Sequence, residues 1–269
     1  MDEKVLAFSN TEFIMLSMLL GADKIVGITD TDNITHIDEK GLQSKWDTIK
    51  KKLQEKNYIK EETDDTLQVD ETVYSLMTRY ISANRYMQIQ VSEKGIDKAS
   101  ELLFISNNGN VNITIQPNEE DSLTISLHEN TTAIRILEKY INIPKNGEQK
   151  ASLENRASLS KAQYYEYMSY MNLSNIEKSA ELLTNTGMNE EIAHDAAKGF
   201  YNKNLFVSIT AADINDPDKL PQMVMFFFGE NNIFNMRVSE NDDEAFIIRA
   251  ISESEFWNAV KSMAGEETV

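Results

Sequence analysis

One pattern occurs twice in this chain, and it constrains the fold more than any other sequence feature. The segment NEEDSLTISLHENTTAIRIL begins at Asn118, and NDDEAFIIRAISESEFWNAV begins 123 residues later, at Asn241. Each has an acidic turn, a strand in which apolar and polar residues alternate, and a segment with apolar residues at helical spacing. Three more strand positions match at the same shift: Val111, Ile113 and Ile115 correspond to Phe234, Met236 and Val238. This agreement indicates an internal duplication.

The duplication limits how the two copies can be arranged. A small antiparallel sheet with one helix leaves unpaired strand edges and an apolar face in water. If two such units pair edge to edge, their unpaired strand edges are joined in one continuous sheet on which the helices can pack. We therefore expect an α+β fold, with an antiparallel sheet built from two pseudo-twofold-related halves and flanked by helical bundles. The expected boundaries are 1–143 for the N-terminal half, 144–157 for a polar linker and 158–269 for the C-terminal half, in one compact body.

Helices are expected before the strands in each half. In the first half, Ser9 and Glu12 have capping-box spacing at the start of a helix that ends near Leu20, a second helix covers 42–56, and Asp70 caps a third. The segment between the last two, NYIKEETDDTLQVD, is typical of a short hairpin. In the second half, Ser158 or Ser160 caps the helix that contains YYEYMSYM, Ser174 caps the next, and a third covers Asn189 to about Tyr201.

Composition excludes several classes of protein. The net charge of −18 disfavours binding to nucleic acid or to anionic membranes, and the absence of cysteine excludes disulfides, thiolate metal sites and cysteine nucleophiles. The first residues lack the basic region and apolar run of a signal peptide, and no apolar run approaches the length that spans a bilayer. We expect a cytoplasmic protein that does not insert into the membrane.

The sequence contains no recognised catalytic motif. It has no G-x-S-x-G elbow, P-loop or dinucleotide-binding glycine pattern. Its three histidines, His36, His128 and His194, have no second histidine at metal-ligand spacing, and the acidic runs lack the spacing of a calcium loop. We therefore expect no enzyme activity, no cofactor and no metal site.

Candidate partner-binding residues lie in two apolar or aromatic segments. QMVMFFFGENNIFNMRV has apolar residues on both faces of a strand, so it is either covered twice or presents one face to a partner. Ile233 and Phe234 follow a turn, where we expect exposure. YYEYMSYM offers tyrosines outside its apolar helical face. The predicted contact residues are Phe226, Phe228, Ile233, Phe234, Met236, Tyr165 and Tyr170.

A winged-helix DNA-binding regulator is the alternative hypothesis for the N-terminal third. Its recognition helix would be 42–56, which carries Lys45, Lys50, Lys51, Lys52 and Lys56. The hairpin in the place of the wing is acidic, which opposes a phosphate backbone.

The overall layout resembles the EspG-like export chaperones of type VII (ESX) secretion systems, in the form found in Gram-positive bacteria outside the mycobacteria. The resemblance rests on FSNTEFIMLSMLLGAD near the N-terminus, on LQEKNYIKEETDDTLQVDETVYSLM, and on the doubled strand–strand–helix unit. It implies a cytosolic chaperone with a quasi-twofold fold that binds the tip of a small helical-hairpin substrate of the WXG100 class. Such a chaperone keeps its substrate soluble and directs it to secretion-machine components.

The chain itself does not have the features of such a substrate. Neither Trp46 nor Trp257 is part of a W-x-G turn, and the C-terminal segment contains no tyrosine for a Y-x-x-x-[DE] signal. The sequence therefore predicts a protein that handles a secretion substrate.

Overall fold

The computed structural model places most of the 269-residue chain. The structure describes residues 4–30, 32–61, 66–107, 109–115, 123–127, 132–141, 143, 155–216, 218–238 and 246–265. Both acidic turns of the sequence repeat, at 118–121 and 241–244, lie outside these ranges, as does His128.

One order of elements occurs twice along the chain: a strand, three α-helices, four strands and a closing helix. The first series is β1 (Lys4–Phe8), α1 (Asn10–Leu19), α2 (Glu39–Glu55), α3 (Glu71–Ile81), β4 (Arg85–Glu93), β5 (Ile96–Ile105), β6 (Val111–Ile115), β7 (Leu123–Leu127) and α4 (Ala133–Glu138). A 3₁₀ turn, η1 (Ile34–His36), and a hairpin of β2 (Ile59–Glu61) and β3 (Leu67–Val69) are inserted in it. The second series is β8 (Arg156–Leu159), α5 (Lys161–Asn172), α6 (Ile176–Asn185), α7 (Glu190–Tyr201), β9 (Phe206–Asp213), β10 (Gln222–Phe228), β11 (Ile233–Val238), β12 (Phe246–Ile251) and α8 (Glu253–Ala264).

Ten strands are hydrogen-bonded in the order β1-β7-β6-β5-β4-β9-β10-β11-β12-β8. Every strand pair whose register is described is antiparallel. The predicted α+β class with an antiparallel sheet is therefore confirmed. Adding 123 to the residue numbers of β6 gives 234–238, which lie within β11. The internal duplication itself stays a prediction.

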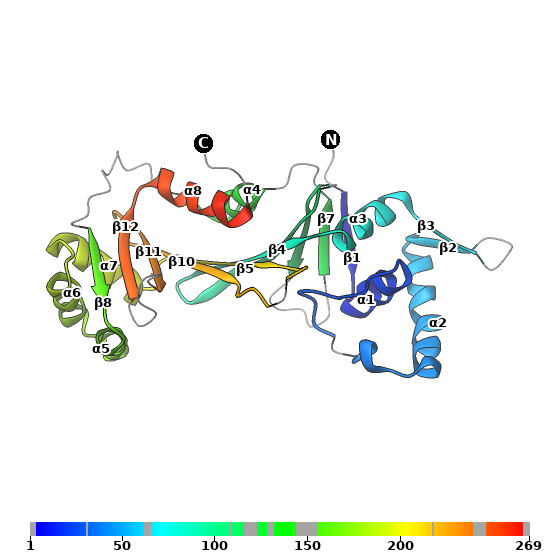
Figure 1. Ribbon diagram of the computed structural model, residues 1–269, viewed down its shortest axis with the longest axis horizontal. Coiled ribbons are helices and arrows are strands. Elements are labelled where there is room, and N and C mark those ends of the chain that lie inside the picture. The colour runs from blue at the N-terminus through cyan, green and yellow to red at the C-terminus, as the bar shows by residue number, and fades with distance from the viewer. Residues whose placement is uncertain are drawn as a thin grey trace. The chain divides into compact units, whose positions relative to one another are not determined.

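The chain divides into two compact units, and Figure 1 labels most of the helices and strands that form them. Unit 1 comprises 1–87, 100–132 and 212–219, and unit 2 comprises 88–99, 133–211 and 220–269. The boundaries expected from the sequence stay a prediction, because only 155–157 of the expected linker lie within the described residues.

In unit 1, local capping signals start the helices that the sequence predicts. The Ser9 hydroxyl accepts from the Glu12 amide while the Glu12 carboxylate accepts from the Ser9 amide, which completes the capping box of α1. The Asp70 carboxylate caps α3 by accepting from the amides of Thr72 and Val73. The apolar faces of α1, α2 and α3 then bury one side of β1, β5, β6 and β7 in a shared core.

In unit 2, the sheet is covered on both faces. The core under α5, α6 and α7 contains Phe227, Phe234 and Ile248 from three neighbouring strands, whereas Phe256 of α8 packs on Phe226, which points to the opposite face of β10. Ser160 caps α5 and Asn189 caps α7. The cap predicted at Ser174 is wrong: Ser174 has a left-handed φ of 58°, and the Asn175 side chain caps α6.

Candidate protein-binding surface

Five of the seven predicted contact residues lie inside the protein. Phe226, Phe228, Ile233, Phe234 and Met236 are all buried. The exposure expected for Ile233 and Phe234 is therefore wrong, and both side chains form part of the core in this structure.

These side chains are buried because helices of unit 2 pack on both faces of β10. Phe226 and Phe228 point to one face, where their ring centroids lie 4.7 and 5.9 Å from that of Phe256 on α8. Phe227 points to the other face and stacks on Phe234 at 5.0 Å. The run of three phenylalanines is thus a central strand that is covered twice, which was one of its two interpretations from sequence.

The turn between β10 and β11 is fixed by a buried carboxylate. Asp195 on α7 accepts hydrogen bonds from the amides of Glu230 (2.7 Å) and Asn231 (3.2 Å) and from the Asn232 side chain (2.6 Å). A Cβ at Gly229 would lie 2.4 Å from this carboxylate, so glycine is required there. Because helix α7 holds the turn, Ile233 begins β11 inside the unit, and the sequence offered no local signal for this long-range contact.

The two predicted tyrosines of α5 have different surroundings. Tyr165 is 63% exposed. Tyr170 is half-buried, its hydroxyl donates to the Glu166 carboxylate at 2.5 Å, and the Lys178 ammonium lies 5.5 Å from its ring centroid. The bond to Glu166 raises the pKa of Tyr170. Tyr165 therefore remains available to a partner, whereas Tyr170 is engaged by its own helical bundle.

An incompletely covered part of the sheet lies beside the start of α5. We name it the open sheet face and define it by Met223 and Met225 of β10, Met236 and Val238 of β11, Phe246 of β12, and Tyr164 of α5. The strand register places these residues side by side: Met225 pairs with Met236, and Val238 pairs with Phe246. Strand alternation directs their side chains to the same face as the α5–α7 core.

Cover by the helices decreases along this face. Phe227 and Phe234 are fully buried and Met236 is barely accessible, whereas Met223 is 59% exposed and Val238 is 50% exposed. At the boundary, the ring of Tyr164 stacks on Phe246 with centroids 4.0 Å apart. The result is a continuous apolar surface of methionine, valine and aromatic side chains, a composition that suits contact with a helical protein segment. Of its members, the sequence interpretation named only Met236 as a contact residue; the run of apolar residues in β10 was a signal for Met223 and Met225.

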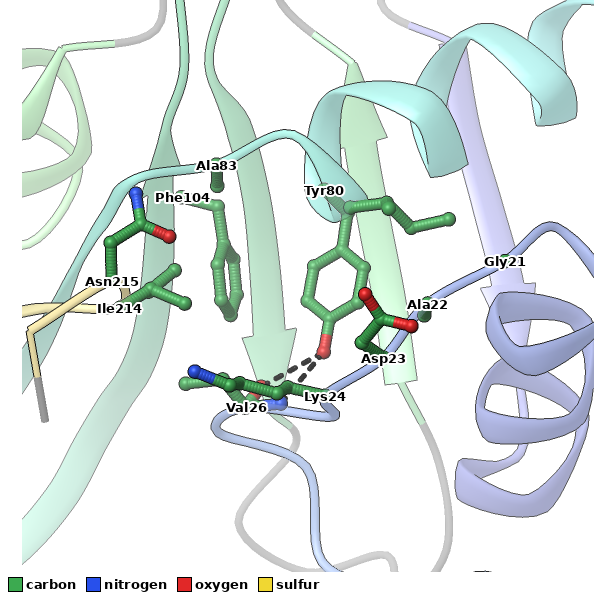
Figure 2. Close-up of a pocket in the computed structure, with 11 residues that line it drawn as sticks. Gly21, Ala22, Asp23, Lys24, Val26, Tyr80, Ala83, Phe104, Ile214 and Asn215 are labelled. Carbon is green, nitrogen blue, oxygen red and sulfur yellow. Dashed lines mark hydrogen bonds between the residues drawn. The ribbon is translucent and has the colours of Figure 1, made fainter.

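A pocket of about 240 Å³ lies within unit 1 and is shown in Figure 2. Tyr80 and Phe104 form its aromatic wall, and Asp23, Lys24 and Asn215 also line it. The Tyr80 hydroxyl accepts from the Val26 amide at 2.9 Å and donates to the Val26 carbonyl at 3.1 Å, and burial raises its pKa to about 12. A hydroxyl whose proton and acceptor site are both bonded to the backbone of Val26 has a structural role.

The described residues contain no group of three or more aspartate, glutamate, histidine or cysteine side chains that could hold a metal ion. The imidazole of His194 lies 3.6 Å from the Glu177 carboxylate on the bundle surface. Three lysines of the predicted recognition helix pair with acids of unit 1: Lys45 with Asp32, Lys50 with Glu61 and Lys56 with Glu12. These pairs lower the positive charge that α2 could offer to a phosphate backbone.

Within the described ranges, no helix is both long enough and apolar enough to cross a membrane.

Comparison with solved structures gives a match over almost the whole chain. No protein-family model matches the chain, and no curated protein does. Among solved structures, the chain is similar to the Mycobacterium tuberculosis type VII secretion system chaperone EspG5, in a structure of its complex with a PE25-PPE41 dimer. The match covers 98% of this chain and 97% of that chain, with a TM-score of 0.63 and 12% sequence identity. The chain therefore shares its fold with this secretion chaperone.

Proposed function

We propose that the chain is a cytoplasmic chaperone of type VII secretion, of the EspG-like kind found in Gram-positive bacteria outside the mycobacteria. Its open sheet face binds the apolar tip of a small helical-hairpin substrate of the WXG100 class and keeps that substrate competent for export. The observation that carries the proposal is this apolar, incompletely covered part of the sheet in unit 2.

The chemistry of the surface suits a helical partner. Methionine side chains are flexible and polarisable, so they adapt to the irregular end of a helical hairpin. Met223, Met225 and Met236 are neighbours on two strands, and on the same face Tyr164 of α5 stacks on Phe246 and lies beside the ring of Tyr165. Apolar side chains of a helix tip laid on this surface lose contact with water, which is the main source of affinity in this mode of recognition.

Two further features support a binding role. The chain shares its fold, over almost its whole length, with a chaperone whose structure was determined with a PE25-PPE41 dimer bound. The net charge of −18 keeps a protein with an exposed apolar face soluble and disfavours association between its own copies. Binding and shielding a substrate also need no catalytic group, and the protein acts as a binding partner rather than an enzyme.

The proposal is tested by co-expression with a small WXG100-like protein encoded near the gene for this chain. We expect a stable complex on size-exclusion chromatography and a measurable Kd by isothermal titration calorimetry. The double variant Met223→Glu, Val238→Glu places two carboxylates where the substrate tip would exclude water. It should weaken binding by about a hundredfold, since each buried unpaired charge costs well over tenfold in affinity.

A matched control comes from the same unit. Ile96 is 65% exposed on β5 and is not part of the open sheet face, so Ile96→Glu should leave the Kd unchanged. Equal binding by the double variant and the wild type would reject this surface. Absence of any complex with every WXG100-like protein of the genome would reject the substrate class.

A further inference from the structure

The outer edge of β1 is occupied by side chains. β1 is an end strand of the sheet and pairs with β7 alone, with Ala7 opposite Thr124 and Leu6 opposite Ile125. In an antiparallel strand, every second residue directs its amide and carbonyl away from the neighbouring strand. An end strand therefore presents a row of backbone groups with which another chain can pair.

Ala7 is one of the outward-facing residues, and its two backbone groups are bonded to side chains. Its amide donates to the Tyr58 hydroxyl at 3.0 Å, and its carbonyl accepts from that hydroxyl at 3.3 Å and from the Lys56 ammonium at 3.1 Å. One tyrosine hydroxyl thus replaces both hydrogen bonds that a neighbouring strand would make at this residue.

An ion pair between exposed Lys56 and a buried carboxylate holds these side chains in position. Lys56 lies 2.6 Å from the carboxylate of Glu12, which is almost fully buried and also accepts from the Ser9 amide at 2.8 Å. The Tyr58 ring packs on Phe8 with centroids 4.8 Å apart. Because Lys56 ends α2 and Glu12 lies in the first turn of α1, the contact joins two helices to the strand edge.

The bonds at Ala7 leave little of the edge for another strand. Alternation makes Val5 the next outward-facing residue towards the N-terminus, and in the other direction the Ser9 amide is bonded to Glu12. A strand that added here would find free backbone groups only at Val5 within β1, whereas strands in sheets are commonly five to six residues long. The sequence of β1, KVLAF, is otherwise apolar and suited to pairing with itself.

We propose that Tyr58 and Lys56 form a latch that closes the β1 edge, and that loss of the latch lets β1 pair antiparallel with β1 of a second copy of this chain. The second copy is the occupant because antiparallel pairing of two identical edges about a twofold axis is self-complementary. The latch thus keeps copies apart at a strand whose own sequence favours their association.

The test compares Tyr58→Phe with the wild type by size-exclusion chromatography with light scattering and by hydrogen exchange. Tyr58→Phe keeps the ring against Phe8 and removes only the hydroxyl. We expect amide exchange at Ala7 to rise roughly fivefold in dilute solution, as loss of one hydrogen bond predicts. At high protein concentration we expect the mass to double relative to the wild type, with new protection at the outward-facing amides of Val5 and Ala7.

Adding Val5→Pro to Tyr58→Phe should restore the wild-type mass, since proline cannot donate to a new ladder. Tyr74→Phe, at an exposed tyrosine of α3, is the control and should change neither mass nor exchange. If Tyr58→Phe loses its far-ultraviolet circular dichroism, Lys56→Gln is measured in its place. A variant mass equal to that of the wild type, or a dimer that survives Val5→Pro, overturns the proposal.

Discussion

The helix-facing sides of the sheet in the two units have matching strands but different cover. We compare the burial of three strand positions in unit 1 with that of the positions 123 residues later in unit 2. The pairs are Leu102 and Met225, Ile113 and Met236, and Leu123 and Phe246. The three residues of unit 1 are buried beneath α1, α2 and α3. Of the three in unit 2, Met236 is barely accessible and the other two are only partly buried under α5, α6 and α7.

This difference separates a closed core from the surface that we propose binds a substrate. Branched leucine and isoleucine fill a closed core, while unbranched methionine adapts to whatever packs on it. The same order of elements therefore closes its sheet in unit 1 and leaves apolar positions open in unit 2. Leucine or isoleucine occupies the three closed positions of unit 1, and methionine or phenylalanine occupies the three equivalent positions of unit 2.

The largest expected effect compares two equivalent positions directly. Leu123→Ala removes a buried side chain and should lower the free energy of unfolding of unit 1 by about 2–5 kcal/mol. Phe246→Ala removes a partly exposed ring and should cost unit 2 about 1–2 kcal/mol. Urea unfolding followed by tryptophan fluorescence measures both, because Trp46 lies in unit 1 and Trp257 in unit 2. Equal losses at the two positions would mean that the two faces are equally closed.

Alkaline pH should act on the closed core through Tyr80. Burial raises the pKa of Tyr80 from 10.0 to about 12, so the unfolded state loses this proton first. The associated stability is complete below pH 10 and is lost as pH rises from 10 to 12, by about 2–3 kcal/mol. Urea unfolding of the wild type and of Tyr80→Phe between pH 8 and 12 measures this loss as a difference. A pH-independent difference between the two proteins would contradict the assignment.

A smaller effect distinguishes the buried tyrosines of the two units. The Tyr80 hydroxyl is bonded to Val26, whereas the fully buried Tyr167 hydroxyl has no hydrogen-bond partner among the described residues. Tyr80→Phe should therefore destabilise the protein by about 1 kcal/mol, and Tyr167→Phe should stabilise it by about 1 kcal/mol or more. Thermal unfolding at pH 7 measures whether each substitution raises or lowers the stability of the protein. Destabilisation by Tyr167→Phe would show that its hydroxyl is bonded in solution.

Local sequence signals predicted much of the fold. Ser9 with Glu12 and Asp70 are the predicted caps, and they cap their helices in the structure, since a cap depends only on residues within one helical turn. The alternation in 111–115 and 123–127 predicted β6 and β7. The end strands β1 and β8 were missed, because four or five residues give too short a pattern.

The candidate site was harder to predict, because burial depends on distant elements. Phe226 and Phe228 are covered by α8, and Ile233 is placed by the contact of Asp195 with the preceding turn. Neither contact can be predicted from the pattern of apolar and polar residues within β10 and β11. Met223 and Val238 are exposed for the corresponding reason: they are not part of the core that packs under α5, α6 and α7.

The central claim is that the open sheet face is where a secretion substrate binds, and methionine methyl resonances report on it directly. Met223, Met225 and Met236 lie on this face, and Met15 and Met77 lie in the core of unit 1. We predict that titration with the WXG100-like partner shifts or broadens the methyl signals of the first three and leaves those of the last two unchanged. A partner that binds with the signals of Met223, Met225 and Met236 unchanged would contradict the account.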